Sequence, residues 1–514
     1  MSNNLDAFKS TIQEGYTFNG DSIIVGTAIL DKSPIQNAPI KLPLKTLNRH
    51  GLIAGATGTG KTKSIQLLSE QLSDSGVSVL MMDIKGDFSG IAQAGTSNKI
   101  VEDRTALIGN KWQPTAYPVE LMTISNQDGV RLRSTTLEFG PILISKILDL
   151  NDTQQSVMSI VFKYADDEAL PLVDLKDLKK VLQYLSNEGK EAIEKDYGSI
   201  SPATLGTITR KIVELEQQGA ELFFGEPSFD VKDLLRKDEN GRGFVNIIRL
   251  TDIQDKPKLF STFMLSLLAE VYSTFPERGD LDRPELVIFI DEAHLVFNEA
   301  SKTLLEQIET IIKLIRSKGV GIFFCTQNPT DIPSDVLAQL GLKVQHALRA
   351  FTAKDRQAIK LVAQNYPITE YYKVEDDITQ LGIGEVFVTA LNEKGIPTPL
   401  VHTLMSPPQS RMDVLSPEET KAHIEQSALY KKYKDAVDSE SAYELLNNRI
   451  NAIAVEKESQ EAPAPKQQKV SVPKSSPSTF EKVLNNKTTK SLATTATREI
   501  TRGLLGILVK AFKK

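Results

Sequence analysis

Short apolar runs alternate along the chain with stretches in which apolar residues recur at helical spacing. Each run has the length of a strand that is buried on both faces, as the strands of a parallel sheet are. The clearest runs occupy residues 50–54, 77–83, 286–290 and 321–327. The stretches at 63–72 and 300–318 carry their apolar residues on one helical face. This alternation predicts an α/β fold with a mostly parallel sheet.

The pattern changes outside this alternation and predicts further segments. Residues 1–48 hold a strand pattern and a proline-broken strap, too little for a separate domain. Residues 140–225 show helical spacing only, which predicts an all-helical insertion between two parts of a core at 49–139 and 226–405. The segments expected after the core are C-terminal helices at 406–457, a flexible linker at 458–497 and a basic amphipathic helix at 498–514.

The first apolar run leads into the stretch G-A-T-G-T-G-K-T at residues 55–62. It matches the G-x-x-x-x-G-K-[ST] pattern of a phosphate-binding loop, and it lies between a predicted strand and a predicted helix. Glycines let backbone N–H groups surround an anion, Lys61 brings a charge to the β- and γ-phosphates, and the Thr62 hydroxyl can ligate Mg²⁺. ATP with Mg²⁺ is the expected ligand. Its expected contacts are Gly55, Ala56, Thr57, Gly58, Thr59, Gly60, Lys61, Thr62 and Lys63.

Polar residues follow two of the later apolar runs. Asp291 and Glu292 come directly after the run at 286–290, and Gln327 ends the run that follows. In phosphate-loop enzymes an Asp at this place holds the Mg²⁺ hydration shell, and a Glu beside it can deprotonate the attacking water. An amide such as that of Gln327 can hydrogen-bond the γ-phosphate or that water. These residues predict a site for ATP hydrolysis; a parallel strand that merely ends in solvated acids is the alternative interpretation.

Two further charged residues, Asp83 and Lys85, stand at the end of the second run. Ligands bind at the carboxyl ends of strands in open α/β sheets, so we expect both residues near the nucleotide. A simple charged turn at a strand end is an equally good interpretation.

Composition limits the partners and the location. The net charge is −6, but residues 466–514 carry a surplus of nine positive charges, which leaves the rest near −15. Contact with a polyanion must therefore use local patches or an assembled pore. Cys325 is the only cysteine, which excludes an internal disulfide and fits a reducing cytoplasm. No apolar run approaches the ~18 residues of a membrane span, and no export signal is visible. We expect a cytoplasmic protein without membrane insertion.

The stretches 55–62, 291–292 and 326–329 together resemble the HerA–FtsK group of ring-forming P-loop ATPases, and D-I-K-G at 83–86 matches an acidic-lysine motif of that group. Other stretches are similar to a bacterial branch of HerA-like predicted ATPases. They are R-H-G-L-I-A-G at 49–55, F-F-G-E-P at 223–227, L-I-R-S-K-G-V-G at 314–321 and V-Q-H-A-L-R-A-F at 344–351. The likeness covers roughly residues 20–410 and the basic C-terminal helix. A full N-terminal β-barrel, as in archaeal HerA, is lacking.

The resemblance implies a RecA-like core in a homohexameric ring, with ATP at subunit interfaces and a central pore; relatives of this kind translocate DNA. In such rings an arginine of the neighbouring subunit commonly stabilises the γ-phosphate transition state. The candidates are Arg349, Arg316 and Arg356, in that order, and an internal salt bridge is the alternative for each. No stacking platform or helix-turn-helix pattern is visible, which argues against DNA sequence specificity.

A DNA-translocating or helicase-like ATPase ring is the first functional hypothesis. An ATPase module that drives a protein partner, as in a defence or envelope complex, remains open beside it. A nucleotide or metabolite kinase is disfavoured, because a water-activating Glu292 is unwanted where water must be excluded. The sequence does not distinguish DNA from RNA.

The basic segment 498–514 places Ile500, Leu504, Leu508 and Phe512 on one helical face. A helix of this length is unstable alone in water and needs a partner surface. We expect it to dock in a groove on the ring rather than on an anionic membrane or DNA. Deleting residues 498–514 should weaken oligomerisation or ATPase activity at low protein concentration. A fully active ring that has lost liposome binding would contradict this expectation.

Overall fold

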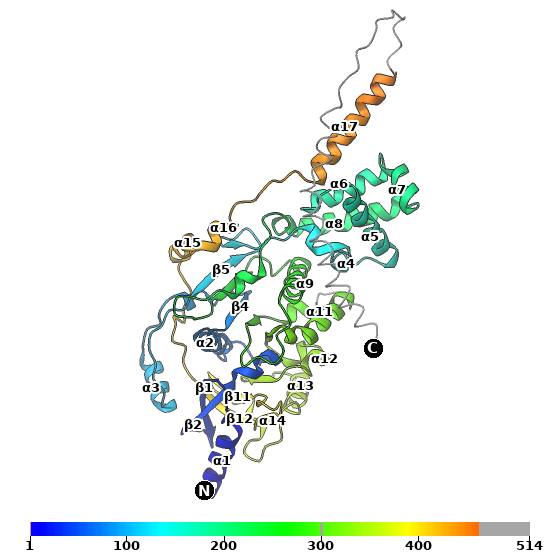
Figure 1. Ribbon diagram of the computed structural model, residues 1–514. Coiled ribbons are helices and arrows are strands. Elements are labelled where there is room, and N and C mark those ends of the chain that lie inside the picture. The colour runs from blue at the N-terminus through cyan, green and yellow to red at the C-terminus, as the bar shows by residue number, and fades with distance from the viewer. Residues whose placement is uncertain (1, 299–301, 462–514) are drawn as a thin grey trace, which may run out of the picture. The chain divides into compact units, whose positions relative to one another are not determined.

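The apolar runs form the centre of one sheet in the computed structural model, which describes residues 2–298 and 302–461 (Figure 1). The sheet has twelve strands in the order β2-β1-β12-β11-β10-β3-β9-β8-β4-β7-β5-β6. From β10 to β6 all neighbouring strands run parallel, whereas β2, β1, β12 and β11 pair antiparallel. The mostly parallel α/β sheet predicted from the sequence is therefore confirmed. The strands are β1 Ser22–Leu30, β2 Ser33–Pro43, β3 Gly51–Ala54, β4 Ser78–Asp83, β5 Val119–Thr123, β6 Val130–Arg131, β7 Val245–Arg249, β8 Leu286–Ile290, β9 Val320–Thr326, β10 Leu342–Gln345, β11 Glu385–Thr389 and β12 Val401–Met405.

Contacts divide the described residues into two units. The first unit holds the whole sheet and comprises the chain up to Leu132 together with Phe229–Asp435. Its helices are α1 Ser2–Gly15, α2 Lys61–Asp74, α3 Lys99–Ile108, α9 Pro257–Thr274, α10 His294–Asn298, α11 Lys302–Ile315, α12 Ser334–Leu337, α13 Ala353–Ala363, α14 Val374–Asp377, α15 Pro417–Gln426 and α16 Ala428–Tyr433, with short 3₁₀ turns η1 Leu44–Arg49, η2 Ser89–Ala92, η4 Val231–Leu235, η5 Arg316–Lys318 and η6 Pro329–Asp331.

The core of this unit forms where α2 packs on the sheet. Helix α2 begins at the end of the phosphate loop and buries its Ile65, Leu68 and Leu72 in one cluster with residues of most strands of the sheet. The strand residues in that cluster include Ile53, Met81, Ile247, Phe289 and Cys325. Cys325 is therefore a fully buried packing residue. Because α2 is packed along its length, the loop that precedes it has a rigid base.

The second unit comprises Arg133–Ser228 and the described residues from Ala436 onward. Its helices are α4 Thr136–Ile147, α5 Asp152–Asp167, α6 Leu175–Ser186, α7 Lys190–Tyr197, α8 Pro202–Gln217 and α17 Ala442–Glu461, with the turn η3 Ala220–Leu222. Helix α17 is tied to α6 by the buried carboxylate of Asp177, which accepts hydrogen bonds from the Ser441 hydroxyl and, over 2.9 Å, from the Tyr443 N–H. Arg449 also pairs with Glu168 at 2.8 Å.

Several details differ from the sequence expectations. Residues 2–15 form a helix, α1, whose Phe8 and Ile12 are buried, where only a strand and a strap were expected. The stretch 343–350 has the pattern of one continuous strand in the sequence, but β10 ends at Gln345, so Arg349 lies in a loop. The predicted C-terminal helical segment is divided at Asp435 between the two units. Residues 458–461 lie in α17, while the remainder of the predicted linker and the basic segment 498–514 lie outside the described residues.

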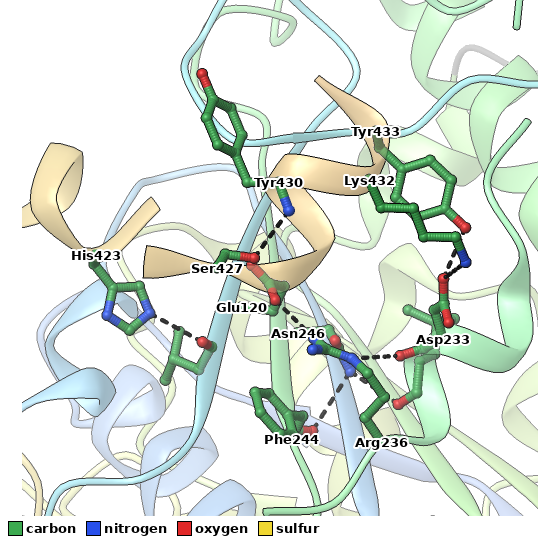
Figure 2. Close-up of polar contacts among 12 residues, drawn as sticks. Glu120, Asp233, Arg236, Phe244, Asn246, His423, Ser427, Tyr430, Lys432 and Tyr433 are labelled. Carbon is green, nitrogen blue, oxygen red and sulfur yellow. Dashed lines mark hydrogen bonds and ion pairs between the residues drawn. The ribbon is translucent and has the colours of Figure 1, made fainter. Parts of the chain in front are cut away.

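Helices α15 and α16 lie beside the β5 end of the sheet (Figure 2). His423 of α15 places its Nε2 2.9 Å from a backbone carbonyl oxygen of β5, and the Arg236 guanidinium donates to Glu120 in the same strand over 2.7 Å. Figure 2 also shows Lys432 of α16 against Asp233, with 2.8 Å between Nζ and Oδ2. The terminal strand β6 is short, and these helices protect the edge from pairing with another chain.

None of the helices among residues 2–298 and 302–461 is both long enough and apolar enough to cross a membrane.

Candidate nucleotide-binding and hydrolysis site

The phosphate loop joins β3 to α2 and turns at three glycines. Gly55, Gly58 and Gly60 have φ angles of 154°, 77° and 104°, which residues with a Cβ rarely adopt. A Cβ on Gly55 would lie 2.4 Å from the Cβ of His346, whereas nothing lies within 4 Å of the Cβ position at Gly58. The loop is therefore pressed against a neighbouring strand end at Gly55 and borders open space at Gly58, as a backbone cradle for an anion requires.

Residues that follow β10 and precede β11 hold the loop in this shape. The Ala56 N–H donates to the Ala347 carbonyl over 2.8 Å. The Thr59 carbonyl oxygen accepts from the Gly384 N–H at 3.0 Å and lies 3.0 Å from Nδ1 of His346. The loop therefore has fixed contacts on the side of β10 and β11.

His346 is a site residue that the motifs did not reveal. Its side chain is fully buried, and burial lowers its pKa to about 4, so the ring is neutral at physiological pH. Because a carbonyl oxygen can only accept, Nδ1 carries the hydrogen, and the buried Nε2 has no hydrogen-bond partner among the described residues. His346 lies in the stretch 344–351 singled out from the sequence, but its contact with the loop depends on the parallel pairing of β10 with β3, which has no local signal.

Lys61 is the first residue of α2 and is 8% exposed. Its Nζ donates to the carbonyl oxygens of Gly55 and, over 3.4 Å, of Ala56. Burial lowers the pKa of Lys61, and the charge of Lys85 lowers it further. Thr62 follows on the first turn, and in the described part of the chain its hydroxyl makes no hydrogen bond. The loop thus presents an ammonium group and a free hydroxyl at the helix N-terminus.

Asp291 and Glu292 follow β8, which is separated from β3 by β9 alone. All three strands are parallel, so their carboxyl ends meet at the edge that carries the phosphate loop. Asp291 is 7% exposed, and burial raises its pKa to about 7 against the opposing effect of Lys85. A divalent cation would favour the ionised form of such a carboxyl.

Glu292 is held by residues from two other strand ends. Lys85, after β4, forms an ion pair with Oε1, and the Gln327 amide donates to the same oxygen over 3.4 Å. Burial by itself would raise the pKa of Glu292, but the contacts with Lys85 and Gln327 hold it below its ordinary value. Oε2 lies 3.2 Å from Nδ1 of His294 without the alignment of a hydrogen bond. One oxygen of an ionised carboxylate is therefore buried at this edge of the sheet without a hydrogen-bond donor among the described residues.

Asp83 and Lys85 were both expected near the nucleotide, but their side chains make different contacts. The Asp83 carboxylate accepts from the backbone N–H groups of Gly86, Asp87 and Phe88, over 2.7, 3.0 and 3.3 Å. Burial raises the pKa of Asp83 to about 6 in spite of these bonds. Asp83 thus shapes the turn that carries Lys85, and Lys85 itself forms an ion pair with Glu292.

These residues fit a magnesium nucleotide. Mg²⁺ is commonly held by one or two protein oxygens together with phosphate oxygens and waters, and Thr62 and Asp291 supply such oxygens beside the loop. A metal ion held by protein alone would need more ligands, and no cluster of three or more His, Cys, Asp or Glu that could hold one occurs in the described ranges.

Comparison with known proteins identifies the family of the chain. The family model described as helicase HerA-like C-terminal matches residues 29–514. The chain belongs to the HerA-like family. The DNA double-strand break repair helicase HerA of Saccharolobus solfataricus is 22% identical over 69% of this chain and 64% of its own length. A probable helicase of Methanocaldococcus jannaschii is 24% identical over 72% of this chain and 68% of its own length. The match thus spans less than two-thirds of the first of these relatives.

The fold of the HerA-like chain also has solved counterparts. The plasmid coupling protein TrwB, in complex with a non-hydrolysable GTP analogue, aligns with a TM-score of 0.50 over 78% of this chain and 99% of that chain, at 13% identity. At this identity the likeness concerns the fold alone, which is that of RecA-like P-loop ATPases.

The structure places two of the candidate arginines of the HerA-like chain at opposite edges of the sheet and the third on a helix. Arg349 follows β10 on the phosphate-loop edge, is exposed and donates to the Thr379 carbonyl over 3.0 Å. Arg316 precedes β9, so it lies at the opposite edge, and Arg356 lies on α13. Both side chains are exposed and make no ion pair or hydrogen bond with the residues described. None of the three contacts Lys61 or Glu292 within the described chain.

The side chain of Lys63 donates to the Met412 carbonyl and, over 3.3 Å, to the Gln66 side-chain oxygen. It begins a polar row on α2 that continues with Gln66 and Glu70. Gln66 donates to the Ser410 hydroxyl over 2.7 Å. The carboxylate of Glu70 accepts from the N–H groups of Gln409 and Ser410 over 2.8 and 3.0 Å, and from the Ser410 hydroxyl. The segment 409–412 is thereby held along α2, the helix that follows the phosphate loop.

Replacing Glu70 by Ala should destabilise the HerA-like chain strongly. Glu70 is 1% exposed, so its removal leaves buried donors without an acceptor, at a cost of about 2–4 kcal/mol. Thermal unfolding of the purified variant measures this as a lowered Tm. Gln71→Ala, on the same helix and without a side-chain hydrogen bond among the described residues, is the control and should leave the Tm nearly unchanged. Equal Tm values for both variants would contradict the fastening role.

Proposed function

We propose that this chain hydrolyses ATP and uses the reaction to move along DNA as a subunit of a homohexameric ring. The observation that carries the hydrolytic part is the environment of Glu292. It is an ionised carboxylate at the end of β8, on the edge of the phosphate loop, with Lys85 and Gln327 on one oxygen. A binding protein needs no such group, and a phosphotransferase would exclude the water that it activates.

In this proposal the residues of the site have separate roles in phosphate binding, Mg²⁺ binding and activation of water. The N–H groups of residues 55–62 and the Lys61 ammonium bind the phosphates, and Thr62 and Asp291 would hold Mg²⁺, which when bound neutralises charge on the phosphate oxygens. Glu292 orients the attacking water and accepts its proton. Gln327 and Lys85 position Glu292, because both contact the same oxygen of its carboxylate.

The DNA substrate and the ring rest on the family. Several relatives are named DNA double-strand break repair helicases, which supports DNA as the substrate of this chain. Residues 466–514 carry a surplus of positive charge. This segment can therefore contribute contacts with DNA phosphates. A cytoplasmic location, expected from the composition, is part of the same proposal.

The decisive experiment measures the ATPase rate of the full chain, sized by light scattering, without nucleic acid and with double- or single-stranded DNA. The proposal expects a hexamer whose turnover rises several-fold with DNA and falls again with salt, because phosphate contacts release counterions. A hydrolysing ring that ignores both DNA forms would favour the alternative, in which the motor drives a protein partner.

An arginine should act across the ring interface. Ring contacts join different surfaces of neighbouring subunits, so an exposed arginine of one subunit can reach the phosphate loop of the next. Rings mixed from Lys61→Ala subunits and Arg349→Ala subunits, or Lys61→Ala and Arg316→Ala subunits, should regain up to about a quarter of wild-type turnover, since only some interfaces then join two intact residues. Arg356 is the third candidate, and Arg356→Ala subunits are mixed with Lys61→Ala subunits in the same way. A failure of every mixture to recover activity would argue against action in trans.

A further inference from the structure

The sheet order places the hydrolytic residues on one side of the phosphate loop. On one side of β3 lie β9, β8 and β4, in that order. Gln327 follows β9, Asp291 and Glu292 follow β8, and Lys85 follows β4. On the other side of β3 lie β10 and then β11. The two sides of the loop therefore have different chemistry.

This asymmetry orients a bound nucleotide. The γ-phosphate must face Glu292 for water to attack it, so it lies on the β9 side of the loop. The phosphate chain follows the loop from there, and its α-phosphate end, with the ribose and base, extends toward β10 and β11.

The segment just before β11 is joined to the phosphate loop. The Gly384 N–H donates to the Thr59 carbonyl at 3.0 Å, and a Cβ on Gly60 would lie 3.2 Å from the same nitrogen. The residue before it, Ile383, is 70% exposed. A large apolar side chain is thus held at the surface directly beside the loop.

Helix α3 adds to this surface. Arg104 donates through Nη2 to the Ile383 carbonyl over 2.9 Å, and through Nη1 to the carbonyls of Met405 and Gly384 over 3.4 and 3.5 Å. Ile100 and Leu107 lie four residues before and three after Arg104, hence on the same helical face. They are 73% and 49% exposed. Arg104 thus joins the segment with the exposed Ile383 to a helix that exposes Ile100 and Leu107 on the same side as Arg104.

We propose that Ile383, Ile100 and Leu107 form the subsite for the base and ribose of the nucleotide, and that Arg104 is its positioning residue. The proposal rests on the proposed ATP hydrolysis and names where the nucleoside binds. A flat base packs on aliphatic side chains and removes their apolar area from water. Continuity with the phosphate loop, through Gly384 and Thr59, favours the nucleoside over any other occupant of this surface.

The test compares ATP with inorganic tripolyphosphate, which has the phosphates but no base. Ile383→Ser and Ile100→Ser should each weaken ATP binding by calorimetry about tenfold, as expected for loss of one aliphatic contact. Binding of tripolyphosphate and turnover at saturating ATP should stay within about twofold of wild type. Arg104→Ala should weaken ATP in the same selective way, with partial rescue by Arg104→Lys. Ile396→Ser is the control, because Ile396 is 56% exposed and follows β11 at the opposite edge of the sheet.

Other outcomes overturn the subsite. Unchanged ATP affinity in the Ile383 and Ile100 variants would remove it, and an equal loss of ATP and tripolyphosphate would assign these residues to the loop's structure. A changed oligomeric mass without a selective loss of ATP would assign the surface to contact between copies of the chain. Wild-type protein that binds tripolyphosphate and ATP equally would also refute the subsite, whereas wild-type protein that binds neither would refute the proposed ATPase itself.

Discussion

Glu292→Gln should bind ATP with an affinity within a few-fold of wild type and lose at least about a hundredfold in turnover. Proton transfer by a positioned carboxylate contributes about 10²–10⁴-fold to a rate. The amide keeps the size of the side chain but cannot accept the proton of the attacking water. Since the loss occurs in the transition state, kcat should fall while the dissociation constant of ATP changes little. Steady-state hydrolysis and calorimetry with Mg²⁺ measure the two quantities.

Two controls make this result specific. Glu285→Gln changes a carboxylate at the start of the same strand, where it pairs with Arg278 at 2.9 Å on the opposite edge of the sheet. Its turnover should stay near wild type. Lys85→Met leaves Glu292 in place but removes its ion-pair partner, so it should lower turnover less than Glu292→Gln and shift the pH profile of kcat, because the pKa of Glu292 then rises. Wild-type turnover in Glu292→Gln would refute the base assignment.

Lys61→Ala should lose both ATP binding and hydrolysis. The ammonium group is buried within the loop, beside the carbonyls of Gly55 and Ala56, where it would meet the phosphate charge in a site largely shielded from water. A charge–charge contact of this kind is strong because screening by solvent is weak. We expect the ATP dissociation constant to rise at least about tenfold and kcat/KM to fall by about 10²–10³-fold.

The neighbouring Lys63 supplies the matched control. It lies on the same first turn of α2, but its Nζ contacts the Met412 carbonyl. Lys63→Ala keeps the backbone N–H that is expected to face the phosphates. It should lower the Tm slightly and leave ATP affinity within a few-fold of wild type. Equal losses in the two variants would show that charge anywhere on this turn, rather than Lys61 in the loop, governs binding.

Local patterns in the sequence were enough to predict the parts of the site that are contiguous. The stretch at 55–62 and the acids at 291–292 are each defined by residues that are neighbours in the chain, and the apolar runs before them predicted the strands β3 and β8. The parallel sheet followed from the same runs. Boundaries were less accurate, because strand length depends on which neighbours a strand pairs with; β10 ends at Gln345, earlier than its apolar pattern suggested.

Contacts between distant segments were decided only by the tertiary structure. Lys85 and Glu292 are about two hundred residues apart in the sequence, and their ion pair exists because β4 lies next to β8. Asp83 and Lys85 carried the same expectation from the sequence. In the structure Asp83 accepts hydrogen bonds within a turn, whereas Lys85 forms an ion pair with Glu292. The polar residues of α2 from Lys63 to Glu70 bind the segment 409–412, and no pattern in the sequence indicates this contact.

The sequence by itself determined which chemistry the chain carries, since the phosphate loop and its acids need only local order to be recognised. The tertiary structure decided how that chemistry is held in place. His346 and Gly384 converge on the Thr59 carbonyl from β10 and β11, and neither residue has a local signal for this role. The physical reason is that strand order is set by the packing of the whole sheet, and strand order determines which loops meet at its edge.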